Sequence, residues 1–77
     1  MTYEEMAKNI NAHVDLYIDA HEVKKEFVAE AIGVSRTAFY QKLRGASSFD
    51  AREAYELANL IGCTVDELLT TCPERKP

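Results

Sequence analysis

The sequence predicts an all-α domain of five helices, and three observations carry this prediction. Apolar residues recur at spacings of three and four, which is the period of an amphipathic helix. Glycine occurs only three times and proline only within the last five residues, so long helices with short joints fit better than β-hairpins. Finally, a Thr or Asp followed three residues later by Glu occurs at Thr2, Asp50 and Thr64, where this pattern marks a helix start.

The length and the hydropathy of the chain indicate one small intracellular domain. We expect a single domain over residues 1–71 and a short flexible tail over residues 72–77, because a chain of 77 residues suffices for only one core. No stretch approaches the roughly 18 apolar residues of a membrane-spanning helix. The first residues also lack the basic and apolar regions of a signal peptide. The protein is therefore expected in the cytoplasm, with no membrane partner.

The first helix is predicted to begin at Tyr3 and to end near His21. Thr2 and Glu5 form its capping box, in which each side chain bonds a free backbone N–H group of the other residue. Its buried stripe, spaced by four, four and three residues, consists of Met6, Ile10, Val14 and Tyr17.

Several residues of this helix fall outside the stripe. Tyr3, Leu16 and Ile18 are either exposed singly or mark a surface for a second chain. His13 and His21 have neither a catalytic nor a metal-ligand setting, so we expect both at the surface or its boundary.

The segment 24–45 is predicted to form two short helices, over about residues 24–32 and 36–44, joined by a tight turn. Gly33 can take the positive φ that the turn needs, Val34 fills the angle between the helices, and Ser35 can cap the second helix. Gly45 is a natural residue for the end of that helix. The buried edges consist of Val28, Ala29 and Ile32 on the first helix and of Phe39 and Leu43 on the second.

Two further helices complete the prediction. A fourth helix follows the capping box of Asp50 and Glu53 and stops at Gly62, and a short fifth helix follows the capping box of Thr64 and Glu67. Their apolar residues are expected to pack on the core, and these are Ala54, Leu57, Ala58, Ile61, Val65, Leu68 and Leu69.

Charge is distributed unevenly along the chain. The net charge is −4, which is unusual for a protein that binds nucleic acid. Residues 24–52, however, contain six basic and three acidic residues, whereas the remainder contains three basic and ten acidic residues. A local basic face can still meet phosphates, because charges more than about 8 Å away are screened at physiological salt.

The residue types that support catalysis or metal binding are not arranged for it. Cys63 and Cys72 have no CxxC spacing and no companion histidine pair, so neither a metal site nor a disulfide is predicted. Cys63 is expected to pack as a small hydrophobic residue. Neither an activated nucleophile nor a glycine-rich phosphate loop is recognisable. We therefore expect no enzyme, no cofactor and no small-molecule ligand.

The run from about residue 10 to residue 69 resembles the Cro/CI-type (XRE-like) helix-turn-helix repressors of phages and bacteria. The residues that carry the resemblance are Val28-Ala29, Ile32-Gly33-Val34-Ser35, Phe39, Gly45, Ala58, Leu60 to Gly62, and the ending from Gly62 to Leu69. The resemblance implies a compact five-helix, lambda-repressor-like domain whose helix after Ser35 lies in the major groove of DNA. The chain departs from the family pattern at Lys42, where many relatives carry an aliphatic residue, and at Lys24, where many carry a capping Ser or Thr.

The resemblance assigns Arg36, Thr37, Gln41, Ser35 and Arg44 to DNA, with Tyr40 beside them, and the charges of Lys25 and Lys42 add two contacts to phosphates. The predicted base contacts are Arg36, Thr37 and Gln41, and the predicted contacts to the DNA backbone are Lys25, Ser35, Tyr40, Lys42 and Arg44. The chemistry of two of these side chains agrees, because Arg36 can bind guanine O6 and N7 and Gln41 can bind adenine N6 and N7. The sequence therefore predicts a phage-type repressor that binds a double-stranded operator, as a homodimer. The alternative is a protein-interaction module on the same fold, antitoxin-like or antirepressor-like, which uses the acidic first helix.

Overall fold

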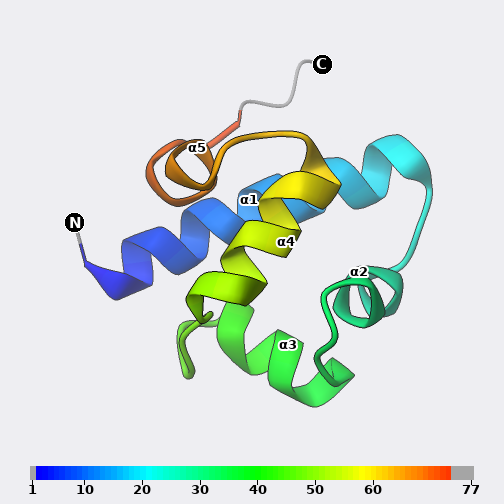
Figure 1. The fold of residues 1–77 in the computed structure, drawn as a ribbon, viewed down its shortest axis with the longest axis horizontal. Helices are drawn as coiled ribbons and strands as arrows, with labels where there is room; N and C mark the ends of the chain where they lie inside the picture. Colours follow the sequence, from blue (N-terminus) through cyan, green and yellow to red (C-terminus); the bar gives the residue numbers. More distant parts are fainter. Residues whose placement is uncertain (1, 74–77) are drawn as a thin grey trace.

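The computed structural model describes residues 2–73, and this part of the chain forms five helices and no strand (Figure 1). The helices are α1 (Tyr3–His21), α2 (Lys25–Ala31), α3 (Arg36–Leu43), α4 (Ala51–Ile61) and α5 (Val65–Thr70). The predicted all-α class is therefore confirmed, and each predicted helix is present within two residues of its expected bounds. Residues 74–77 of the predicted tail lie outside the described residues.

Side chains at the helix starts determine where four of the helices begin. Thr2, Asp50 and Thr64 each form a capping box with the glutamate three residues later, as predicted. The hydroxyl of Ser35 accepts a hydrogen bond from the Ala38 N–H group at 3.2 Å and so caps α3. α2 begins after Lys24, which forms no side-chain cap, so this start lacks the hydrogen bond that caps the other four helices.

Four helices are followed within two residues by a residue with positive φ, and the residue after α4 is Gly62 with a φ of 93°. Gly33 and Gly45 follow α2 and α3 with φ values of 77° and 83°. After both helices two backbone N–H groups turn back onto the last turn, which is the hydrogen-bonding pattern of a glycine-terminated helix. α1 ends instead at Glu22, whose φ of 53° is uncommon for a residue with a Cβ atom.

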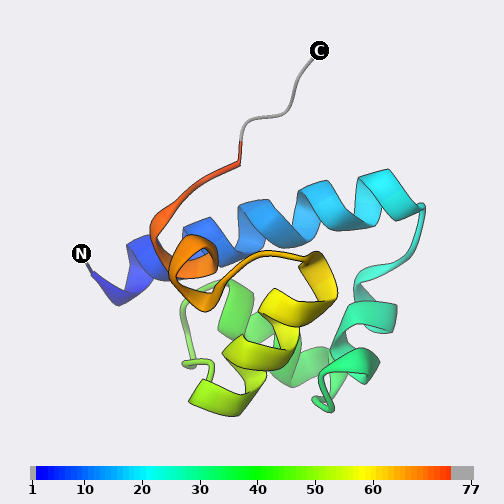
Figure 2. The same ribbon diagram turned by 45° about the horizontal axis from the view of Figure 1, so that its top comes forward.

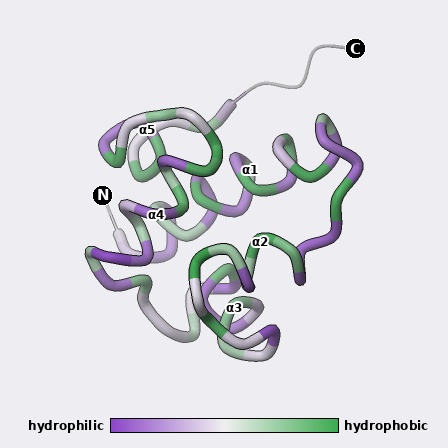
Figure 3. Tube along the Cα trace, turned by 45° about the vertical axis from the view of Figure 1, so that its right-hand side comes forward, coloured by the Kyte–Doolittle hydropathy of each residue, from purple (hydrophilic) through white to green (hydrophobic). Residues whose placement is uncertain are grey.

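α1 forms one side of the molecule, and the other four helices pack against it (Figure 2). Hydrophobic and hydrophilic residues alternate along each helix, as expected for helices that bury one side only (Figure 3). The buried core consists of Ile10, Val14, Val28, Ala29, Ile32, Phe39, Leu43, Leu57, Ala58 and Leu68. Phe39, which is fully buried, lies edge-to-face with Phe49 of the loop before α4, with the ring centroids 6.1 Å apart.

The prediction for His13 is wrong. The residue is buried between α1 and the end of α5, and its Nε2 atom lies 3.1 Å from the Glu67 carbonyl oxygen and 3.0 Å from the Thr71 carbonyl oxygen. The sequence pattern missed this role because the partners are backbone oxygens more than 50 residues away along the chain. His21 is exposed, as predicted, and its ring centroid lies 4.3 Å from that of the Tyr17 ring, with the two planes tilted by 38°.

The three large apolar or aromatic residues of α1 outside the predicted stripe are partly buried. Ile18 packs against the core, and Leu16 is half-buried. Tyr3 is also half-buried, and its hydroxyl donates a hydrogen bond to the carbonyl oxygen of Ser47 in the loop after α3. This hydrogen bond links the first turn of α1 to the loop that follows α3.

Cys63 packs against the core, as the sequence predicted. Burial and the nearby Glu67 carboxylate raise the pKa of its thiol. The thiol therefore remains protonated at neutral pH and behaves as a small apolar group. Cys72 is exposed, and both cysteines are free thiols.

Candidate nucleic-acid interface

The turn between α2 and α3 is held in place from both sides. The N–H of Val34 donates to the Ala29 carbonyl at 3.0 Å, and Val34 packs against the core. Arg52 of α4 approaches from outside, with its Nη1 atom 3.4 Å from the Ile32 carbonyl oxygen. A Cβ atom added to Gly33 would lie 3.9 Å from the same guanidinium. The angle between α2 and α3 is thus determined by packing and by backbone hydrogen bonds.

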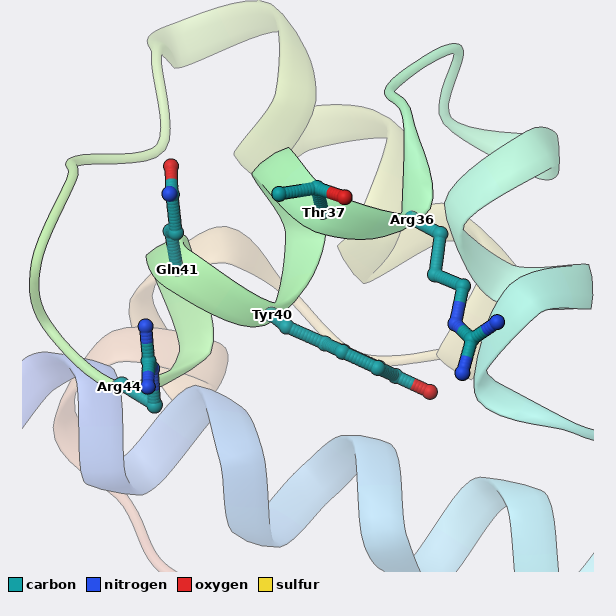
Figure 4. Close-up of a pocket in the computed structure, with 5 residues that line it drawn as sticks. All are labelled: Arg36, Thr37, Tyr40, Gln41 and Arg44. Carbon is teal, nitrogen blue, oxygen red and sulfur yellow. The ribbon is translucent and has the colours of Figure 1, made fainter.

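The outward side of α3 carries polar and aromatic side chains around an open hollow (Figure 4). We call this surface the α3 face, and its residues are Arg36, Thr37, Tyr40, Gln41 and Arg44. The hollow between these side chains has a volume of about 490 Å³. The opposite side of the helix is anchored by Phe39 and Leu43, which are 0% and 6% exposed. Because these two anchors are buried, Arg36, Thr37, Gln41 and Arg44 are exposed on the other side of the helix, whereas the Tyr40 ring is half-buried and packs against the core.

Arg36 and Tyr40 form one half of the α3 face, next to α2 (Figure 4). The Cζ atom of Arg36 lies 5.6 Å from the centre of the Tyr40 ring, and its Nε atom lies 3.3 Å from the Glu26 carboxylate on α2. Lys25 approaches the same ring at 5.8 Å and pairs with Asp15 of α1 at 3.7 Å. The half-buried Tyr40 ring thus lies near two cations, each of which also has an acidic partner.

Gln41 and Arg44 form the other half of the face, towards the end of α3 (Figure 4). Both side chains are exposed, as is Thr37 at the first turn. Among residues 2–73, no carboxylate lies within ion-pair distance of Arg44. Its guanidinium is therefore available to an anionic ligand. Ser35 keeps its hydroxyl proton available as well, because its oxygen only accepts the capping hydrogen bond.

Lys42 lies apart from the other predicted site residues. Its ammonium forms an ion pair with Glu53 of α4, and the side chains are only 15% and 6% exposed. The ammonium also lies 5.8 Å from the centre of the Phe49 ring. The Lys42 side chain is thus mostly buried, at the position where many of the Cro/CI-type proteins that the sequence resembles carry an aliphatic residue. This placement does not favour the predicted contact between Lys42 and the DNA backbone.

Two acidic residues of this region were not singled out from the sequence. Glu53 was predicted only as a capping residue, and it does accept the Asp50 N–H at 3.0 Å in addition to binding Lys42. Glu26 was counted only as a charge, although it contacts Arg36. Lys42 lies at a position of α3 that is apolar in many Cro/CI-type proteins, and this could have indicated a buried acidic partner such as Glu53. No sequence pattern indicated the contact of Glu26.

The described residues supply neither a cluster of metal ligands nor a helix that could span a membrane. Within residues 2–73, no group of three or more His, Cys, Asp or Glu side chains could hold a metal ion. None of the five described helices is long and apolar enough to span a membrane.

Comparison with known proteins identifies a family for this chain. The family described as "Cro/C1-type HTH DNA-binding domain" matches residues 13–74, which include the turn, the α3 face and α5. The searches of curated proteins and of solved structures found no match to the chain.

Proposed function

Because this chain belongs to the family of Cro/C1-type HTH DNA-binding domains, we propose that it is a sequence-specific transcriptional regulator, a repressor of the phage type. It acts in the bacterial cytoplasm on double-stranded operator DNA. The observation that carries the proposal is the α3 face, where side chains suited to phosphates and base edges gather on the side of α3 opposite its buried anchors.

We propose that three residues of α3 read bases. Arg36 and Thr37 lie in its first turn, which is the part of a recognition helix that lies deepest in the major groove. Gln41 is one turn further along the same exposed side. Arg36 is suited to guanine and Gln41 to adenine, since their side chains match the paired donor and acceptor groups of these bases.

Four residues around these three are proposed to contact phosphates. They are Lys25, Ser35, Tyr40 and Arg44, which border the base-reading residues on α2, on the turn and on α3. We leave Lys42 out of this set because its ammonium is already paired with Glu53 inside the protein.

The proposed regulator binds as a homodimer. A single domain of this size offers a small interface with DNA, whereas two copies on a two-fold site double the number of contacts. Selection of bound duplexes from a random pool tests the proposal. We expect enrichment of a palindrome whose half-sites are about 10 base pairs apart, centre to centre. A pool without any enriched sequence would contradict sequence-specific binding.

Replacing Arg44 by alanine should weaken binding to every duplex by the same factor. Its unpaired guanidinium is proposed to neutralise one phosphate, so its loss should reduce the slope of log K against log salt by about 1. Affinity measured at several salt concentrations, on the selected site and on a scrambled duplex, checks this result. Lys8→Ala is the matched control, since Lys8 is an exposed cation of α1 outside the α3 face. A larger loss on the selected site than on the scrambled duplex would make Arg44 a base-reading residue.

A second candidate function, as a protein-interaction module, is favoured by a separate apolar groove of about 540 Å³. Side chains from α1, α4, α5 and the loop before α4 line it, among them Met6, Leu69 and Tyr55, which is 60% exposed. An acidic group borders the groove, because Asp50 belongs to its lining. A second copy would bring like charges together, so the proposed occupant is an apolar, basic segment of another protein.

This second function can be tested with a short amphipathic Leu–Lys peptide, with a Leu–Glu peptide of the same pattern as the control. Under the proposal only the Leu–Lys peptide shifts the NMR resonances of Met6, Tyr55 and Leu69. The same shifts produced by raising the protein concentration alone would assign the groove to a second copy. Equal binding of both peptides, or of neither, would also contradict the proposal.

A further inference from the structure

Arg36 does not project freely from α3, because its side chain lies next to α2 with the guanidinium near the Tyr40 ring (Figure 4). We propose that Glu26 of α2 is a positioning residue that holds Arg36 in this direction and thereby sets which base Arg36 reads. The inference rests on the proposed function, in which Arg36 contacts a base, and it adds a residue that lies outside α3 and outside the α3 face.

The contact between Glu26 and Arg36 leaves the two Nη atoms of the guanidinium free. Glu26 binds the Nε side of Arg36 at 3.3 Å, and a guanidinium carries five N–H groups. The four N–H groups on the two Nη atoms therefore remain, and the Arg36 side chain is 66% exposed. A pair of parallel N–H groups is what the O6 and N7 atoms of guanine require. Glu26 can hold Arg36 without competing for the groups that read the base.

Tyr40 provides the second constraint on Arg36. The ring face attracts the guanidinium, and the ring itself is half-buried, packs against the core and also lies near Lys25. Lys25 in turn pairs with Asp15 of α1. Arg36 is thus fixed by a carboxylate on one side and an aromatic face on the other. A flexible arginine held in this way loses less conformational freedom when it binds a base.

The test compares Glu26→Ala and Glu26→Gln with Glu30→Ala, in the full chain and on the selected operator. Glu30 is an exposed acid on the same helix, so its replacement removes the same charge near the DNA. Arg36→Ala identifies the base that Arg36 reads, because the preference for that base is lost in this variant. In Glu26→Ala the same preference should fall about two- to five-fold, which corresponds to the free energy of an exposed ion pair. Glu26→Gln keeps a hydrogen-bond acceptor and should recover part of it, and Glu30→Ala should keep it all.

The outcomes separate this inference from the proposed function. Full base preference in Glu26→Ala, together with its loss in Arg36→Ala, would overturn the positioning role and leave the regulator standing. A uniform gain of affinity in both Glu26→Ala and Glu30→Ala would reduce Glu26 to a charge that repels phosphates. Absence of any preferred duplex for the wild type would overturn both. Without DNA, the Nε–H resonance of Arg36 should shift in Glu26→Ala and stay unchanged in Glu30→Ala, and an unchanged resonance in both would also overturn the inference.

Discussion

Replacing Lys42 by alanine should lower the free energy of unfolding by about 3–5 kcal/mol, which is a large part of the stability of a small domain. The change removes the ammonium and leaves the Glu53 carboxylate, which is 6% exposed, without its cationic partner. A buried charge without a partner is costly because the interior solvates it poorly. Urea unfolding followed by far-UV circular dichroism measures the effect. Lys8→Ala, which removes an exposed lysine, should change stability by less than about 0.5 kcal/mol.

A double variant shows whether the lost partner or the lost packing is responsible. Lys42→Met fills the same space without charge, and Glu53→Gln keeps an acceptor for the Asp50 N–H group. The double variant should lie within about 1 kcal/mol of the wild type or above it, because an apolar replacement of both charges is often neutral or stabilising. If the double variant unfolds as easily as Lys42→Ala, the cause is the lost lysine itself and not the unpaired carboxylate.

Replacing Arg36 by alanine should remove discrimination at one base pair of the operator, worth about 1–3 kcal/mol, or roughly 5- to 150-fold. The reason is the loss of the two parallel N–H groups that Arg36 is proposed to present to a guanine. The measurement is the affinity for the selected operator and for three duplexes that differ at that base pair. In the variant all four affinities should become similar, while the preferences at the other base pairs remain.

Arg44→Ala is the matched comparison for Arg36→Ala, since both remove one exposed arginine from the same outward side of the motif. The two variants should differ in kind, with loss of one base preference for Arg36 and uniform weakening for Arg44. Uniform weakening in both variants would show that Arg36 contacts the DNA backbone. The choice of Arg36 as a base-reading residue would then be wrong.

Local signals in the sequence predicted the fold well. Thr2, Asp50 and Thr64 marked three helix starts, because a capping box joins residues only three apart. Gly33 and Gly45 marked two helix ends for a similarly local reason. The apolar period placed Phe39 and Leu43 on the buried side of α3 and so left four residues of the α3 face exposed and Tyr40 half-buried.

What the sequence did not predict depends on contacts between distant segments. His13 is buried by backbone oxygens at the end of α5, and these carry no signature in the residue pattern. Lys42 was assigned to DNA because a basic residue in that helix is typical of a phosphate contact, whereas Glu53 on α4 holds it inside. The contact between Glu26 and Arg36 depends on how α2 and α3 cross, which the spacing of apolar residues does not determine.

The stretch that comparison recognises is shorter than the stretch that folds. The match begins at residue 13, in the middle of α1, yet Ala7 and Ile10 before it are 2% and 1% exposed. The hydrogen bond from Tyr3 to Ser47 also starts in this earlier part and reaches the segment just beyond α3. A fragment cut where the match begins would open the interior and lose the hydrogen bond that holds the loop after α3. Any transplant of this DNA-binding unit onto another protein therefore has to carry all of α1 with it.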